Sequence, residues 1–149
     1  MKYCMNSTIN FLVCLAKTQT VIARVFDGGM GNGIGFHEFL ILYHLKQSDN
    51  EQMRRVDLAE KVGITASGIT RMLLPMEKIG LVKSGSVNED ARVRTVSLTE
   101  GGNLKLTEAQ ERLQYLFEEL MEKNKKEIEV VSRLFVQIIG TALMGPSTR

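Results

Sequence analysis

Residues 56–102 constrain the fold of this chain more than any other segment. The first apolar side chains of this run recur at helical spacing, and Gly63 then interrupts the pattern. Thr65 follows as a residue type that caps helices, and a second apolar stripe of helical period continues to about Ile79. Beyond Gly80 apolar and polar side chains alternate, which is the period of strands. This order predicts a short helix from residue 56, a tight turn, a second helix and then a β-hairpin.

The predicted second helix, from Thr65 to about Ile79, is amphipathic. Its inner face is formed by Ile69, Met72, Leu73, Met76 and Ile79. Its outer face carries Ser67, Thr70 and Arg71. Pro75 lies in mid-helix, where it removes one backbone hydrogen bond, so we expect a kink there. Because the apolar pattern continues beyond this proline, the helix is expected to bend and not to stop.

The polar end of this helix has the chemistry of a DNA reader. A helix N-terminus carries free amides and partial positive charge, which attract phosphate. Ser67 and Thr70 can bond to bases or phosphates, and Arg71 can reach a guanine edge. Gly68 removes bulk and lets the backbone approach. The alternative is the solvated polar face of an ordinary amphipathic helix.

The predicted hairpin supplies separate evidence. Residues 81–84 and 93–98 are its expected strands, and residues 85–91 are its tip. Its cations are Lys83, Arg92 and Arg94. Asp90 stands two residues before Arg92 and can hold its guanidinium by a bidentate pair. An arginine at such a tip can enter a minor groove, whereas the alternative is a surface ion pair of little energetic value.

Helices are predicted on both sides of this segment. Apolar residues at three- and four-residue steps predict a helix over residues 5–26 and a buried helix over residues 36–45. The glycine-rich stretch between them, residues 27–35, has no Gly-Lys-Ser/Thr ending and no preceding strand, so it predicts a flexible connection. Thr99 is expected to cap a long helix, and Asn124 separates it from a final one. A short extended piece near Met53 precedes the first helix of the central segment.

The expected fold class is therefore mainly α with a small β-hairpin. A winged helix-turn-helix lobe occupies residues 36–99, and residues 1–26 and 100–145 form a helical dimerisation region of the same single chain. The terminal helices have apolar stripes that the middle segment cannot cover, so we expect a symmetric homodimer. The alternative is a monomer whose first helix covers the last two.

Composition limits the classes of function. The 149 residues carry a formal net charge of +2, and residues 46–97 hold nine Lys/Arg against seven Asp/Glu, so net charge alone does not indicate nucleic-acid binding. Cys4 and Cys14 would lie about 15 Å apart on one helix, too far for a disulfide with each other. We expect a cytoplasmic protein with no signal peptide and no apolar run long enough to cross a bilayer, the most apolar stretch being residues 130–144.

Several short motifs resemble the MarR family of bacterial regulators. They are Asp57-Leu58-Ala59-Glu60, Gly63-Ile64-Thr65, Ile69-Thr70-Arg71, Glu77-Lys78-Ile79-Gly80-Leu81-Val82, Asp90-Ala91-Arg92 and Leu98-Thr99-Glu100-Gly101-Gly102. The resemblance covers about a third of the chain, and the order of predicted helices fits over all of it. Pro75 departs from the polar residue more common at that position.

The resemblance implies a homodimer that binds a near-palindromic double-stranded DNA operator. It implies that Ser67, Gly68, Thr70 and Arg71 meet the major groove and that Arg92, braced by Asp90, enters the minor groove. The family often binds small aromatic ligands in a cleft between the dimer helices and the DNA-binding lobe. Some relatives sense oxidants through a cysteine of the first helix, a part that Cys14 could take.

These observations predict a dimeric, sequence-specific transcription regulator that acts as a ligand-responsive repressor, and not an enzyme. Thr65, Lys83 and Arg94 complete the expected DNA-binding set. No cofactor or metal is expected, because His37 and His44 share a helix face without a third ligand. The alternatives are a winged-helix protein-interaction module that does not bind DNA and a thiol-based redox sensor.

Overall fold

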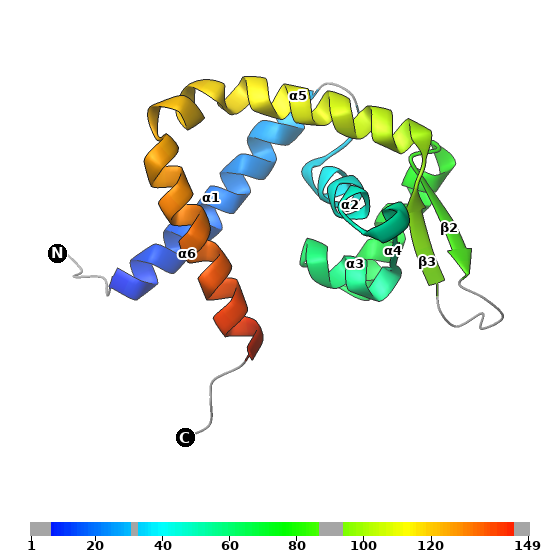
Figure 1. Cartoon of the computed structure of the whole chain (residues 1–149), viewed down its shortest axis with the longest axis horizontal. Helices are drawn as coiled ribbons and strands as arrows, with labels where there is room; N and C mark the ends of the chain where they lie inside the picture. Colours follow the sequence, from blue (N-terminus) through cyan, green and yellow to red (C-terminus); the bar gives the residue numbers. More distant parts are fainter. Residues whose placement is uncertain (1–6, 31–32, 87–93, 145–149) are drawn as a thin grey trace. The chain divides into compact units, whose positions relative to one another are not determined.

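The computed structural model describes residues 7–30, 33–86 and 94–144 (Figure 1). The helices are α1 (Ser7–Met30), α2 (Phe36–Lys46), α3 (Arg55–Val62), α4 (Ala66–Lys78), α5 (Glu100–Lys123) and α6 (Lys125–Met144). The strands are β1 (Gln52–Arg54), β2 (Val82–Ser86) and β3 (Arg94–Leu98), and a 3₁₀ turn, η1 (Asp49–Glu51), precedes β1. The mainly helical fold class with a small antiparallel sheet is thus confirmed. The chain divides into two compact units, residues 1–112 and 113–149.

The core of the first unit lies between α2, α3, α4 and the sheet. Its fully buried side chains include Leu42 and Leu45 of α2, Leu58 of α3, Leu73 of α4 and Val96 of β3. The expectation that α2 is a buried helix is therefore correct. Because α3 and α4 each bury one apolar stripe here, their polar faces remain outside.

The sheet has three antiparallel strands in the order β1-β3-β2. The predicted hairpin is β2 and β3, with Ser84 opposite Val96. The short extended piece near Met53 is a third strand, in which Met53 pairs with Val96. Sequence alternation could not assign this strand to the sheet, because it is only three residues long.

Two glycines with positive φ end the central helices. Gly63 follows α3 with φ of 76°, and Gly80 follows α4 with φ of 77°. Both conformations are left-handed, which glycine adopts without steric cost. The predicted turn at Gly63 and the predicted end at Gly80 are confirmed.

Some helix boundaries and faces differ from expectation. Helix α1 continues through Asp27 and Gly28 to Met30, so the expected break at residue 27 was wrong. Ile79 lies just beyond α4 and is 64% exposed, so its assignment to the inner face was wrong. Helix α4 is continuous through Pro75, as the continuing apolar pattern predicted.

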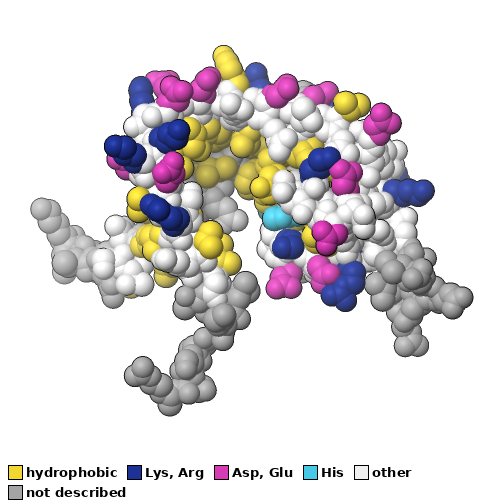
Figure 2. All heavy atoms as spheres, in the orientation of Figure 1, with side chains coloured by type: hydrophobic (Ala, Val, Ile, Leu, Met, Phe, Trp, Pro, Cys, Tyr) yellow, Lys and Arg dark blue, Asp and Glu magenta, His cyan; other side chains and the backbone are white. Residues whose placement is uncertain are grey.

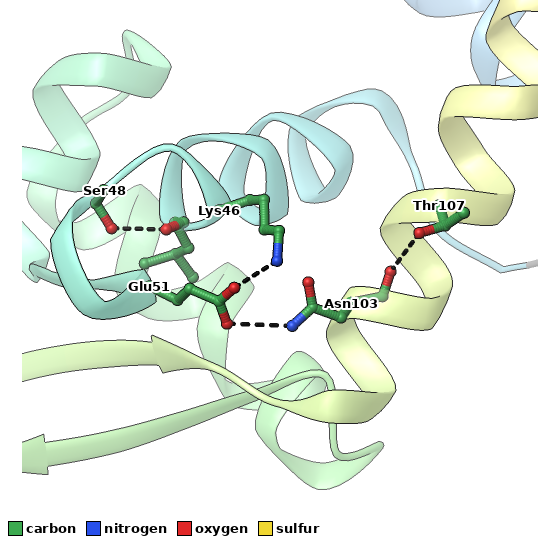
Figure 3. Close-up of polar contacts among 6 residues, drawn as sticks. Lys46, Ser48, Glu51, Asn103 and Thr107 are labelled. Carbon is green, nitrogen blue, oxygen red and sulfur yellow. Dashed lines mark hydrogen bonds and ion pairs between the residues drawn. The ribbon is translucent and has the colours of Figure 1, made fainter.

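The start of α5 belongs to the first unit and is fixed to its neighbours by polar contacts around η1 (Figure 3). The amide nitrogen Nδ2 of Asn103 donates to Oε2 of Glu51 at 3.1 Å, and Lys46 forms an ion pair with the same carboxylate. Thr99 caps α5, as predicted, by accepting a hydrogen bond from the Gly102 amide at 3.0 Å. These contacts tie α5 to the end of α2 and to the sheet.

The terminal helices expose much of their apolar surface. In α1, Ile9, Leu12 and Val13 are each more than half exposed. Residues 7–28 are also long and apolar enough to span a membrane by length and composition alone, a test that core helices and signal sequences pass too. The expectation that no apolar run reaches this length was wrong for α1, because its polar residues are mostly uncharged Ser, Thr, Asn and Gln.

Candidate nucleic-acid interface

The N-terminus of α4 is capped as the sequence predicted. The hydroxyl oxygen of Thr65 accepts a hydrogen bond from the Gly68 amide at 3.1 Å. The hydroxyls of Thr65 and Ser67 are 3.2 Å apart, and Ser67 is exposed. This cap fixes the first turn of α4 and leaves other amides of that turn available to a partner.

Gly68 permits close packing around this cap. A Cβ atom built on Gly68 would lie 3.1 Å from the hydroxyl oxygen of Thr65 and 3.8 Å from the side chain of Ile64. A larger side chain would therefore press on the capping hydroxyl. Gly68 therefore packs closely against the cap while remaining partly exposed to solvent.

Three of the predicted DNA-binding residues meet at one cavity. Thr65, Gly68 and Arg71 line a space of about 690 Å³ together with His37 and Glu38 of α2. Arg71 is exposed and makes no ion pair among the described residues. The donors of its guanidinium are therefore available to a ligand outside the protein.

Thr70 lies on another side of α4 from this cavity. It lines a second cavity, of about 480 Å³, together with Arg94 of β3 and with Arg54 and Arg55 at the start of α3. Its hydroxyl donates to the backbone oxygen of Ala66 at 3.0 Å, so its lone pairs remain available. The structure thus separates Thr70 from Arg71 and brings it to three arginines.

Arg54 and Arg55 were absent from the predicted set of site residues. Sequence reasoning noted only that neither side chain can cap α3, and Arg54 indeed occupies the cap position without a capping hydrogen bond. It binds Asp57 instead, with Nε to Oδ2 at 2.7 Å and Nη2 to Oδ1 at 2.8 Å. The sequence feature that could have indicated them is a pair of adjacent arginines at the start of the first helix of the helix-turn-helix.

This bidentate contact changes the ionisation of both partners. Its hydrogen bonds and charge hold the pKa of Asp57 below its usual value and raise the pKa of Arg54. Both groups are therefore ionised over a wide range of pH. The charge of Arg54 is compensated within the protein.

The predicted hairpin residues are described only in part. Lys83 of β2 and Arg94 of β3 are exposed, and Lys83 lies opposite Ser97 in the sheet. Asp90 and Arg92 lie outside the described residues, so their expected pairing stays a prediction.

The cysteines and histidines that the sequence singled out do not form a site among the described residues. Cys14 is exposed on α1, and Cys4 lies outside the described residues. His37 and His44 line different cavities, so the structure does not bring them together. Burial and the nearby Lys61 ammonium lower the pKa of His44. Within the described ranges no three His, Cys, Asp or Glu side chains form a group that could hold a metal ion.

The central segment is similar to known proteins. Residues 37–93 match the model of the MarR family. An uncharacterized HTH-type transcriptional regulator of Bacillus cereus is 39% identical over 59 residues, which are 40% of this chain and 38% of that relative. The match thus spans well under half of the relative's own length.

Solved structures resemble the fold over most of the chain. A mutant of MarR from Escherichia coli, complexed with operator DNA, has a TM-score of 0.76 at 19% identity and covers 92% of this chain and 99% of its own. NadR in complex with 4-hydroxyphenylacetate also has a TM-score of 0.76, at 20% identity, and covers 93% of this chain and 96% of its own. At these identities the likeness shows the fold alone. Residues 37–93, which include the helix-turn-helix, are thus similar to the MarR family, and the similarity in fold extends over most of the chain.

Proposed function

We propose that this chain is a sequence-specific DNA-binding transcription regulator. The observation that carries the proposal is the exposed polar end of α4. There the Thr65 hydroxyl caps the helix, and Arg71, further along the same helix, forms no ion pair with any acidic side chain among the described residues. In this proposal α4 enters the major groove, with Ser67, Gly68 and Arg71 at base edges or phosphates. The operator-bound MarR structure of similar fold supports this reading.

The hairpin is the second part of the proposed interface. Lys83 and Arg94 approach the DNA backbone, and Arg92, held by Asp90, enters the minor groove. Replacing Arg92 by alanine should lower the affinity for operator DNA and reduce its salt dependence. An unchanged affinity in that variant would remove the hairpin from the proposal.

We further propose that the active form is a homodimer. None of the residues 113–140 is buried, although α6 presents a stripe of apolar side chains. The exposed members of this stripe include Val131, Leu134 and Ile138. An apolar face of this size calls for a partner surface, and a second copy of the chain would also match a near-palindromic operator.

Repression released by a small aromatic ligand is the proposed mode of regulation. A cavity of about 630 Å³ lies between α1 and α2, lined in part by Arg24, Asp27 and Phe36. The carboxylate of Asp27 accepts a hydrogen bond from the Phe36 amide at 2.8 Å, so α1 and the start of α2 are directly linked. An aromatic side chain beside a cation suits an aromatic anion, and NadR is a relative in fold that binds one. Such a regulator would work in the cytoplasm.

The test is selection of bound sequences from a pool of random duplex DNA. The proposal expects enriched sites with two related half-sites about one helical turn apart, because each protomer would place one α4 in the major groove. Failure to enrich any sequence at low salt would favour a winged-helix module that binds only proteins. Enrichment of a single unrepeated half-site would contradict the dimer.

A further inference from the structure

The cavity between the start of α3, the start of β3 and α4 has an unusual concentration of arginine. Arg54 at the end of β1, Arg55 at the start of α3, Arg94 of β3 and Thr70 of α4 all line it. Its volume of about 480 Å³ is ample for a phosphate group and its first waters. All of these residues belong to one compact unit of the fold.

The three guanidinium groups differ in how their charges are compensated. Arg54 binds the Asp57 carboxylate through two hydrogen bonds. No carboxylate forms an ion pair with Arg55 or Arg94 in the part of the chain that the structure describes. As far as the described residues show, the cavity therefore carries two positive charges without a paired carboxylate, a condition that favours an anion.

Arg55 is held in position but not satisfied. Its Nη2 donates to the hydroxyl of Ser84 on β2 at 2.5 Å, which anchors the guanidinium against the sheet. Its Nε is buried and has no hydrogen-bond partner among the described residues. A buried donor on a charged group is costly to leave unpaired, so a small movement of the guanidinium that brings Nε to an acceptor in the cavity would be favourable.

The position of Thr70 relates this cavity to the proposed reading helix. Ala66 and Thr70 line the arginine cavity, whereas Thr65, Gly68 and Arg71 line a different cavity. An anion bound beside Arg55 would thus lie alongside α4. When a helix occupies a major groove, the sugar-phosphate backbone runs along its side.

We propose that this cavity binds one phosphate of the operator backbone through Arg55 and Arg94, and that this contact sets the depth and register of α4 in the groove. The inference rests on the proposed function and adds Arg55 to its machinery as a positioning residue. Arg54 supports the cavity while its own charge remains paired with Asp57. The hydroxyl of Thr70 can donate to the same phosphate if it leaves the Ala66 carbonyl.

The first experiment measures the affinity for a selected operator by fluorescence anisotropy between 50 and 200 mM salt. Replacing Arg55 by glutamine removes the charge, and we expect affinity to fall about tenfold with a salt slope smaller by about one. Arg55→Lys should restore the slope but only part of the affinity, because it lacks the planar fork. Lys78→Gln, which removes an exposed cation at the other end of α4, is the control and should change little. Equal slopes for Arg55→Gln and this control would overturn the proposal.

A second experiment locates the phosphate. A series of operators is made in which one backbone phosphate at a time is replaced by a neutral methylphosphonate. At the position that Arg55 contacts, the replacement should weaken binding of the parent but should not further weaken binding of Arg55→Gln. Fully additive losses at every position would show that Arg55 holds no backbone phosphate. If Arg55→Gln does not fold, Arg94→Gln takes its place, since Arg94 is exposed at the end of a strand.

A third measurement separates a free anion from DNA. Inorganic phosphate, compared with chloride at constant ionic strength, should raise the melting temperature of the parent only slightly. A strong rise that Arg55→Gln abolishes, without any effect of Arg55→Gln on DNA affinity, would overturn the backbone assignment in favour of a free-anion site. If the parent itself shows no salt-dependent DNA binding, the proposed function fails, and that result is distinct from failure of the cavity alone.

Discussion

At the scale of single residues, Glu51 shows how one side chain can join separate elements. It takes a left-handed backbone conformation, with φ of 54°, that few residues other than glycine adopt. Its carboxylate nevertheless meets Lys46 of α2 and Asn103 of α5 (Figure 3). These partners explain why an unfavourable backbone conformation persists here.

The hydrogen bond from Lys46, followed by that from Asn103, lowers the pKa of Glu51 below its usual value. A carboxyl group with a lowered pKa in the folded state stabilises the fold at neutral pH, and this contribution is lost as pH falls through the folded-state pKa. We expect Glu51→Gln to destabilise the protein at pH 7 and to differ less from the parent in acid.

Urea unfolding of both proteins from about pH 7 to about pH 3 measures this difference. The control is Glu60→Gln, because Glu60 is an exposed carboxylate of α3 outside the observed ion pairs. A Glu51→Gln deficit that stays constant with pH would refute the linkage.

At the scale of elements, the junction between the sheet and α5 leaves less room for a side chain than any other described glycine position. A Cβ atom on Gly102 would lie 2.1 Å from the Leu81 carbonyl oxygen and 2.7 Å from Cδ1 of Leu98. In contrast, a Cβ atom on Gly28 of α1 would have no neighbour within 4 Å. The two glycines therefore have different reasons to be present.

We expect Gly102→Ala to destabilise the protein by about 1–3 kcal/mol, because the backbone of α5 or of Leu81 must shift. Gly28→Ala should cost nothing and could stabilise α1 by up to about 1 kcal/mol. Chemical denaturation of the two variants compares them directly. If the two substitutions changed the free energy of unfolding equally, the close contact between Gly102 and Leu81 would have no effect on stability.

Sequence patterns predicted these elements with uneven success. Thr65, Gly63, Gly80, Thr99 and Asn124 mark boundaries through local chemistry, and the structure confirms each of them. The extension of α1 through Gly28 and the arginine cavity could not be read in this way. The first depends on how α1 packs at its end, and the second on strands and helices that meet only in the folded chain.

At the scale of the whole molecule, apolar surface and charge are distributed in different ways. Figure 2 shows acidic and basic side chains interspersed along α5, and hydrophobic side chains exposed on α6. No side chain of residues 113–140 is buried, so the described part of the second unit has no core of its own. The proposed dimer would supply the missing cover.

Val131→Glu places a charge in the apolar stripe of α6, and we expect it to shift the protein from dimer to monomer at micromolar concentration. Arg133→Glu introduces the same side chain on the opposite face of α6 and should leave the assembly unchanged. Sedimentation velocity across a concentration series reads both outcomes. Dissociation by both variants would point to loss of folding, and dissociation by neither would contradict this interface.

The most direct test of the central claim is the affinity of Arg71→Ala for a selected operator, measured by fluorescence anisotropy at several salt concentrations. If α4 reads DNA, we expect the parent to bind with strong salt dependence and Arg71→Ala to lose about 1–3 kcal/mol of discrimination against a mutated half-site. Lys78→Gln, measured in parallel, should retain the parent's discrimination. Parent and Arg71→Ala binding with equal affinity and equal discrimination would contradict the account.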